Sequence, residues 1–202
     1  SVAYLLSVDA DRLLAWFRKE AGLEPRGEVY PGWESESIAG HSLGHYLSGL
    51  SLGYAGTGDD RLRDRARYVV DEIIACQEAG GDGYASAIPN GRAIFEQVSR
   101  GEIRSGGFDL NGSWVPWYTQ HKVLAGLRDA YRYTGYGPAR GSFPALADWA
   151  VDTVSPLRDE QIPRMRAREQ RGMSQAMADA YGSTGERGDR DPPPAPIPPH
   201  PH

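Results

Sequence analysis

The sequence predicts an all-α fold built from repeated helical hairpins, and three observations support this prediction. Apolar residues recur at the three-and-four spacing of amphipathic helices in several segments. One further segment, residues 38–54, carries no charged side chain and is therefore expected to be enclosed by other helices. A short pattern also recurs along the chain. Helical hairpins repeated in this way stack into a solenoid or close into a toroid of inner and outer helices.

The recurring pattern is Leu-x-x-Gly-Tyr-x-x-Thr-Gly at residues 50–58. It returns at residues 127–135 with Ala for the first Gly, and at residues 177–185 with Met for Leu as well. In each copy we expect Leu and Tyr to form an i, i+4 core pair and the last Gly to end the helix in the left-handed conformation. Three such copies correspond to about half of a ring of six hairpins.

The first part of the chain is expected to hold two helices. Residues 1–20 are predicted as one helix, and a loop rich in Gly and Pro follows through Gly32. The uncharged helix then has an apolar face and an opposite polar face, which carry Leu43, Leu47, Leu50 and Tyr54, and His41, His45 and Ser48, respectively. Glycines on both of its flanks predict that neighbouring helices approach closely, since glycine inside a helix costs about 1 kcal/mol relative to alanine.

The later elements follow the same logic. An amphipathic helix is predicted from an N-cap at Asp59 to Cys76, and a short helix at residues 92–99 inside the Gly-rich loop 80–113. Further helices are expected at residues 115–133, 143–154 and 173–181, whereas the Pro-rich residues 191–202 cannot join a helical core. We therefore expect one domain over residues 1–185 and a tail over residues 186–202.

Composition excludes several classes of function. A net charge of −5 and a pI near 5.5 argue against nucleic acid or an anionic membrane surface as the partner. No apolar run approaches the roughly 18 residues of a membrane span. The single cysteine, Cys76, excludes an internal disulfide and a multi-thiolate metal site in this chain, and we expect it to be a buried, inert thiol. The chain lacks an initial Met, so the sequence leaves its localisation unknown.

The polar face of the uncharged helix is the first candidate site. His41 and His45 have the spacing of a two-histidine metal pair, but Ser42 stands where a zinc protease has Glu. Hydrogen bonds within the fold, or contact with a polar ligand in the lumen, are the alternatives. Glu34 and Glu36, which precede the helix, are either lumen carboxylates or caps for its N-terminus.

Residues 106–121 are the second candidate, because they concentrate aromatic and amide side chains with one histidine. Aromatic faces beside planar polar groups are typical of sugar-binding sites, although Trp and Tyr in a long loop also serve to hold it in place. The candidate contacts here are Asp109, Trp117 and His121. The pair of carboxylates that a glycosidase usually needs is not evident from the sequence.

Three stretches carry a specific resemblance to a known family: YLLSVDADRLLAWFRKEAGL, GWESESIAGHSLGHYLSGLSLGYAGTGD and GGFDLNGSWVPWYTQHKVLAGLRDAYRYTG. They strongly resemble the β-L-arabinofuranosidases, glycoside hydrolase family 127 and its sister families. The resemblance implies an (α/α)6 toroid, about half of it present. It also implies hydrolysis of terminal L-arabinofuranosyl groups of plant-type glycans. In that family a zinc-bound cysteine thiolate is the nucleophile and a glutamic acid is the proton donor.

The resemblance implies substrate-contacting roles for His121, His41, His45 and Glu34 in the lumen of the toroid. The family's catalytic and zinc-binding residues lie in a second half that this chain does not reach, and Cys76 matches none of them. We therefore expect no catalytic residue and no bound zinc in this chain, and no turnover by it alone. Gln175 replaces a lumen carboxylate, and the pattern ends after Gly185, which suggests an incomplete or frame-shifted copy.

The leading prediction is thus a glycoside hydrolase domain that binds L-arabinofuranosides. The uncovered faces of its half-ring predict either poor stability or self-association through the open side. The alternative is a non-catalytic carbohydrate-binding or helical-repeat interaction module. A third class is another sugar enzyme on the same toroid, such as an epimerase or a lyase. Glycosidic linkage and oligomeric state do not follow from the sequence.

Overall fold

The computed structural model describes residues 2–35, 38–106 and 108–166, and these residues are mostly helical. The predicted all-α class is confirmed. The first half contains α1 (Val2–Ser7), α2 (Ala10–Glu20), the 3-10 helix η1 (Gly32–Ser35), α3 (His41–Thr57) and α4 (Asp60–Gly80). The second half contains α5 (Gly91–Ser99), three two-residue strands, α6 (Pro116–Thr134), α7 (Gly137–Val154) and α8 (Gln161–Arg166). None of the described helices is long and apolar enough to span a bilayer.

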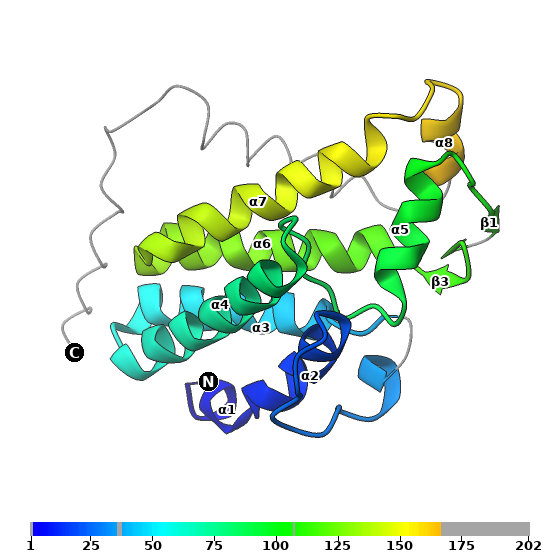
Figure 1. The fold of residues 1–202 in the computed structure, drawn as a ribbon. Coiled ribbons are helices and arrows are strands. Elements are labelled where there is room, and N and C mark those ends of the chain that lie inside the picture. Colours follow the sequence, from blue (N-terminus) through cyan, green and yellow to red (C-terminus); the bar gives the residue numbers. More distant parts are fainter. Residues whose placement is uncertain (1, 36–37, 107, 167–202) are drawn as a thin grey trace, which may run out of the picture.

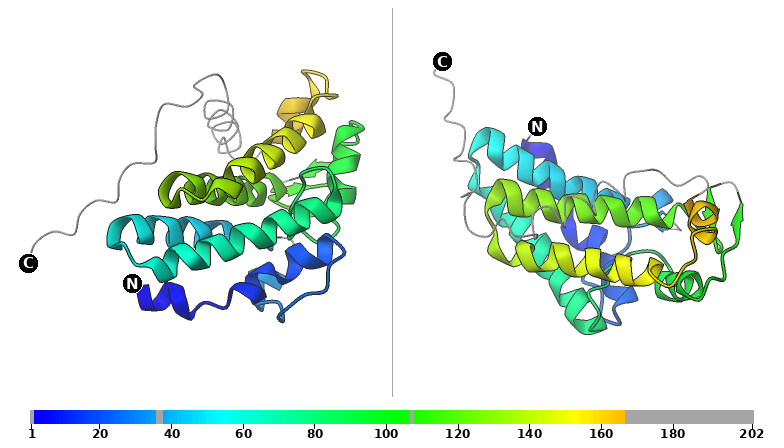
Figure 2. Two further views of the ribbon diagram at one scale, coloured as in Figure 1. Left: turned by 60° about the vertical axis from the view of Figure 1, so that its left-hand side comes forward. Right: turned by 90° about the horizontal axis from the view of Figure 1, so that it is seen from above.

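Helices α3 and α6 lie side by side, and α4 and α7 run back along them in the opposite direction (Figures 1 and 2). The contacts between α3 and α6 run in the same order along both helices: His41 lies near Tyr118, and further along each helix Ser48 donates to Asp129. The two helices are therefore parallel. Helices α1 and α2 pack against α3 and α4 at the other side of this layer. The result is two successive helical hairpins, α3/α4 and α6/α7, as the sequence predicted.

The predicted close approach on the flanks of α3 is confirmed. A Cβ atom added at Gly44 would lie 2.2 Å from the carbonyl oxygen of Lys122, and one at Gly126 would lie 2.8 Å from the Gly44 oxygen. The backbones of α3 and α6 thus touch, which no residue with a side chain would permit. On the opposite flank a Cβ at Gly53 would lie 3.0 Å from Leu62 of α4.

The recurring pattern ends helices in the predicted way in both described copies. Gly58 and Gly135 adopt φ values of 67° and 66°. Their N–H groups donate to the carbonyl oxygens of Tyr54 and Tyr131 at 2.7 and 3.0 Å. These are left-handed helix ends of the kind that glycine favours. The third copy, with the predicted helix 173–181, lies outside the described residues, as does the predicted tail.

The prediction of one helix over residues 1–20 is wrong, because the chain breaks between α1 and α2. Asp9 has an extended backbone, and its side chain accepts hydrogen bonds from the N–H groups of Asp11 and Arg12 at 3.0 and 3.4 Å. It is therefore the N-cap of α2, a role that Asp fills well. Helix α7 also begins earlier than the predicted residue 143, since Pro138 lies in its first turn and Pro144 is accommodated inside it.

The long Gly-rich loop has more structure than the sequence indicated. It contains the predicted short helix, α5, and also an antiparallel sheet of strands β1 (Ser105–Gly106), β2 (Asp109–Leu110) and β3 (Ser113–Trp114). Asn111 and Gly112 form the turn between β2 and β3, with φ values of 52° and 88°. An Asn-Gly pair is typical of a two-residue hairpin turn. This turn brings β3 back along β2, directly before α6 begins.

Candidate functional site

Because α3 and α6 are parallel, their N-terminal ends lie at the same edge of the helical layer. Polar and aromatic side chains gather there from both helices and from the segments that enter them. The group consists of Glu34, His41, His45, Tyr118, His121 and Lys122. The described structure thus brings together four residues that the sequence singled out, namely Glu34 and the three histidines.

Glu34 binds the first turn of α3. Its Oε1 atom lies 2.8 Å from Nδ1 of His41 and accepts the N–H of Ser42 at 3.1 Å, while Oε2 accepts the N–H of Gly40 at 2.8 Å. These are the contacts of a cap, but they come from a residue six positions before the N-cap residue Gly40 instead of from Gly40 itself. The second carboxylate considered from the sequence, Glu36, lies outside the described residues.

The pair of Glu34 and His41 is electrostatically matched. Burial raises the pKa of Glu34, but hydrogen bonds from His41, Ser42 and Gly40 outweigh it, and the net pKa lies below the usual value. The hydrogen bond to Glu34 outweighs burial at His41 and raises its pKa. Both shifts favour a carboxylate beside an imidazolium. Nδ1 of His41, which also lies 2.9 Å from the Ile38 carbonyl oxygen, is thereby held in place, and Nε2 lies 3.4 Å from the Ser42 hydroxyl oxygen.

The other two histidines have the opposite electrostatic character. Burial and the positive charge of Lys122 lower the pKa of both His45 and His121, so both are neutral imidazoles at neutral pH. His45 is one helical turn after His41, with the ring centres 6.3 Å apart and the rings nearly perpendicular. A neutral imidazole offers one donor and one acceptor, which matches a hydroxyl group.

Two neighbours of these histidines had not been singled out from the sequence. The Tyr118 ring lies 6.5 Å from that of His41, and Nζ of Lys122 lies 4.9 Å from the centre of the Tyr118 ring. Tyr118 and Lys122 share a helical face at i, i+4 spacing, on the side of α6 that meets α3. Their spacing could have shown that they share a face, but only the parallel packing shows which helix that face contacts.

The remaining two candidates, Trp117 and Asp109, make contacts that hold the fold together. Trp117 is 4% exposed and packs in a core cluster, with its ring centre 4.7 Å from that of Phe95 and 6.2 Å from that of Trp149. Asp109 accepts the N–H of Gly112 at 2.9 Å and so closes the β2–β3 turn. The described structure does not bring either side chain to the histidines, and a sugar contact by either one stays a prediction.

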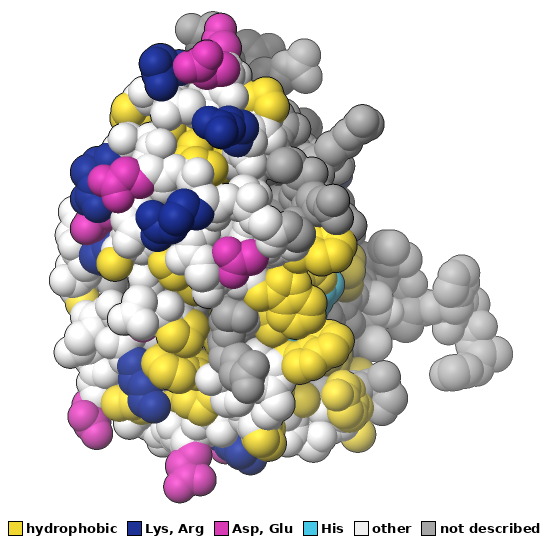
Figure 3. All heavy atoms as spheres, turned by 90° about the vertical axis from the view of Figure 1, so that its right-hand side faces the viewer, with side chains coloured by type: hydrophobic (Ala, Val, Ile, Leu, Met, Phe, Trp, Pro, Cys, Tyr) yellow, Lys and Arg dark blue, Asp and Glu magenta, His cyan; other side chains and the backbone are white. Residues whose placement is uncertain are grey.

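Two exposed tryptophans border the polar group instead. Trp33 in η1 is 66% exposed and Trp114 in β3 is 40% exposed, and their ring centres are 5.8 Å apart at an interplanar angle of 79°. Figure 3 shows hydrophobic side chains gathered beside a histidine on one face of the molecule. The sequence singled out Trp117 in this loop, but its exposed rings are Trp114 and Phe108, which is 56% exposed.

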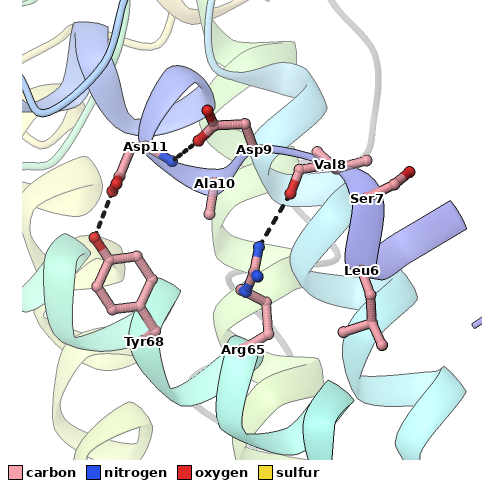
Figure 4. A pocket seen from close by; sticks show the side chains of 8 residues that line it. All are labelled: Leu6, Ser7, Val8, Asp9, Ala10, Asp11, Arg65 and Tyr68. Carbon is pink, nitrogen blue, oxygen red and sulfur yellow. Dashed lines mark hydrogen bonds between the residues drawn. The ribbon is translucent and has the colours of Figure 1, made fainter. Parts of the chain in front are cut away.

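A separate pocket of about 370 Å³ lies where the chain breaks between α1 and α2 (Figure 4). Its polar groups bind one another, since the Tyr68 hydroxyl donates to Asp11 and Arg65 donates to the Val8 carbonyl oxygen at 3.0 Å. These contacts attach the break to α4. The pocket is lined by Leu6, Ser7, Val8, Asp9, Ala10, Asp11, Arg65 and Tyr68.

Fold and site together define a class: stacked αα-hairpins of the toroid type, with a histidine-rich face at one end of the inner helices. Residues 1–188 match the family model for the β-L-arabinofuranosidase catalytic domain of glycoside hydrolase family 127. The chain therefore belongs to this family, which confirms both the resemblance and the (α/α)6 fold type. A search of curated proteins gave no match. The boundary at residue 185 stays a prediction.

The zinc site of the family does not fit the described residues. No group of three or more His, Cys, Asp or Glu side chains in residues 2–35, 38–106 and 108–166 is placed to hold a metal ion. Cys76 is 1% exposed within the core, and burial raises its pKa to about 11. It is therefore the buried thiol that the sequence predicted, and it is unsuited to act as a thiolate nucleophile or ligand.

Proposed function

We propose that the face formed by Glu34, His41, His45 and His121 binds the terminal L-arabinofuranosyl group of a glycan. The observation that carries this proposal is the convergence of three histidines from two parallel inner helices, one of them fixed by Glu34. Membership of the β-L-arabinofuranosidase family supports a carbohydrate as the substrate.

The chemistry of the face suits a small neutral sugar. His41, paired with a carboxylate, is a donor at Nε2, whereas His45 and His121 in the neutral form each donate and accept. Sugar hydroxyls also donate and accept, so fixed imidazoles of both kinds recognise their positions. Because Glu34 is engaged by three donors, it acts in this proposal as the support of His41 and not as a proton donor to the substrate.

We further propose that the 202-residue chain binds this sugar without hydrolysing it. Retaining hydrolysis needs an accessible nucleophile and a protonated acid near the anomeric carbon. Among the described residues, the only thiol is buried in the core and the best-placed carboxyl group has its pKa lowered. Neither group can fill those roles.

Two assays on the purified chain test the proposal. Calorimetry with methyl β-L-arabinofuranoside is expected to show binding that falls about tenfold or more in His121→Ala, because a neutral imidazole that bonds a hydroxyl is removed. Tyr4→Ala, on the exposed α1 helix, is the matched control and should bind normally. Absence of binding by the parent chain would refute the proposed site. Turnover of a nitrophenyl β-L-arabinofuranoside would refute binding without hydrolysis.

A further inference from the structure

Trp33 and Trp114 form an exposed aromatic corner beside the proposed arabinose site. Their rings meet nearly at right angles, at 79°, and both remain 40% or more exposed. Trp33 directly precedes Glu34, and Trp114 lies two residues before Pro116, the first residue of α6. Each tryptophan therefore stands just outside the N-terminal end of one inner helix. Large aromatic rings left adjacent and exposed are a common mark of a binding surface.

The backbone under both rings is held firmly. Trp33 lies in a 3-10 turn that Ser35 closes by donating to the Gly32 carbonyl oxygen at 2.7 Å, and the next residue is the anchored Glu34. Trp114 pairs with Asp109 in the hairpin. Directly after it, Val115 adopts the left-handed conformation, with φ of 44°. This conformation is strained for a residue with a side chain, so the turn from β3 into α6 is held by its surroundings.

We propose that Trp33 and Trp114 form a second sugar subsite, which takes the neutral sugar ring that bears the terminal arabinofuranosyl group. This inference rests on the proposed function, because it places the first sugar at the histidines. The apolar C–H face of a sugar ring packs against an aromatic face, and two rings at right angles offer a face and a wall together. Trp33 directly precedes Glu34, which holds His41, and Trp114 lies four residues before Tyr118, whose ring lies 6.5 Å from that of His41.

The small area of the exposed aromatic corner favours a sugar ring over a protein as the bound partner. A specific protein interface needs about 800 Å² from each partner, whereas the corner offers two rings and the nearby Phe108, whose carbonyl oxygen accepts the N–H of Val115. The other large exposed apolar side chains of the described residues, Tyr4 and Leu52, lie on α1 and in the C-terminal half of α3. A patch of two or three rings matches one sugar unit.

Calorimetry with two ligands tests the subsite: methyl β-L-arabinofuranoside and a disaccharide with a terminal β-L-arabinofuranosyl group. The parent chain is expected to bind the disaccharide about tenfold more tightly, since the second sugar ring adds its contacts with the two aromatic rings. Trp33→Ala and Trp114→Ala should each remove most of this advantage while changing monosaccharide affinity much less. Trp114→Phe, which keeps an aromatic face, should retain part of it. Tyr4→Ala is the control, and circular dichroism verifies folding.

The outcomes separate the two proposals. If both ligands bind equally and the tryptophan variants match the parent, the subsite is refuted while the arabinose site stands. If neither ligand binds, the arabinose site fails and the subsite fails with it. A third outcome is that the parent chain sediments as a dimer and Trp33→Ala as a monomer, with unchanged affinity for the disaccharide. The corner is then a contact between copies of the chain, and the subsite is refuted.

Discussion

The two ends of the inner helices differ sharply. At the C-terminal ends, Thr57 and Thr134 each donate to the carbonyl oxygen four residues earlier, at 2.7 and 2.6 Å. Each hydroxyl oxygen then accepts the N–H two residues later, at 3.2 and 3.3 Å. Gly58 and Gly135 complete the match with nearly equal φ values. These ends are two copies of one device that closes a helical hairpin.

The N-terminal ends of the same helices share no such device. The N-cap residues Gly40 and Val115 are both left-handed, with φ of 99° and 44°, and neither makes a side-chain cap bond. Glu34 caps α3, whereas a β-hairpin leads into α6. The repeat therefore extends over the ends that hold the hairpins together, and it stops before the ends that carry the histidines. The regular ends hold the fold, and the irregular ends carry the groups of the proposed binding site.

The largest expected effect comes from the contact between the inner helices. Gly44→Ala places a Cβ atom 2.2 Å from the Lys122 carbonyl oxygen, and backbone cannot move aside as a side chain can. We expect a loss of about 3 kcal/mol or more in the free energy of unfolding, measured by urea denaturation. Gly56→Ala in the same helix meets nothing within 4 Å and is expected to stabilise by about 0.5–1 kcal/mol. Equal effects of the two variants would contradict the backbone contact.

Glu34→Gln tests the irregular end of α3, and the variant should be less stable by about 2 kcal/mol near pH 5.5. His41 has a raised pKa, so its contribution is full below its unfolded pKa of about 6.5 and is lost as pH rises through the folded pKa. Glu34 has a lowered pKa, so its contribution is full above about 4.5 and is lost as pH falls through its folded pKa.

The difference between parent and Glu34→Gln should therefore peak between about pH 4.5 and 6.5 and shrink on both sides. Thermal unfolding across this range measures it, and NMR titration should show the pKa of His41 falling in the variant. Glu28→Gln, at an exposed position, is the matched control. A difference that does not vary with pH would mean that the pair of Glu34 and His41 is not formed.

Matched substitutions at the C-terminal ends should give matched losses. Gly58→Ala and Gly135→Ala force alanine into the left-handed region at φ near 66°, and the surroundings of Gly58 offer no steric clash. Each variant is expected to lose about 1 kcal/mol, and the two values should agree within about 0.5 kcal/mol. Chemical denaturation measures both. Widely different losses would show that the two ends are not equivalent.

The smallest expected effect is a gain. Val115→Asn replaces a β-branched residue at φ of 44° by one that tolerates the left-handed conformation, so the variant should be more stable by up to about 1 kcal/mol. Asn90, which already adopts φ of 57° before α5, shows that the chain uses Asn in this way elsewhere. A loss of stability would indicate that packing of the Val115 side chain outweighs its backbone strain.

The sequence predicted the fold better than the site for a physical reason. Helix periodicity, Gly flanks and the Thr-Gly ends are local signals, and the helices of the two hairpins could be predicted from them. The break at Asp9 was missed because the apolar spacing continues across it, although Asp is a strong N-cap. The Asn111-Gly112 turn was a local signal that could have revealed the hairpin.

The site depended on contacts that no local pattern contains. Glu34, His41 and His45 could be singled out because they are close in sequence, and His121 because of the family resemblance. Which aromatic ring faces solvent depends on packing: Trp117 enters the core with Phe95 and Trp149. Trp114, three residues earlier, stays exposed and contacts Trp33, which is 81 positions away in the chain.

The central claim is that the irregular ends of α3 and α6 form a sugar-binding face, and NMR titration of the histidine rings with methyl β-L-arabinofuranoside tests it most directly. The chain has five histidines. Signals of His41, His45 and His121 are predicted to shift together and to saturate with a single Kd, while those of His200 and His202 serve as references. If the first three signals shift no more than the references at saturating sugar, the ends of α3 and α6 do not form a sugar-binding face.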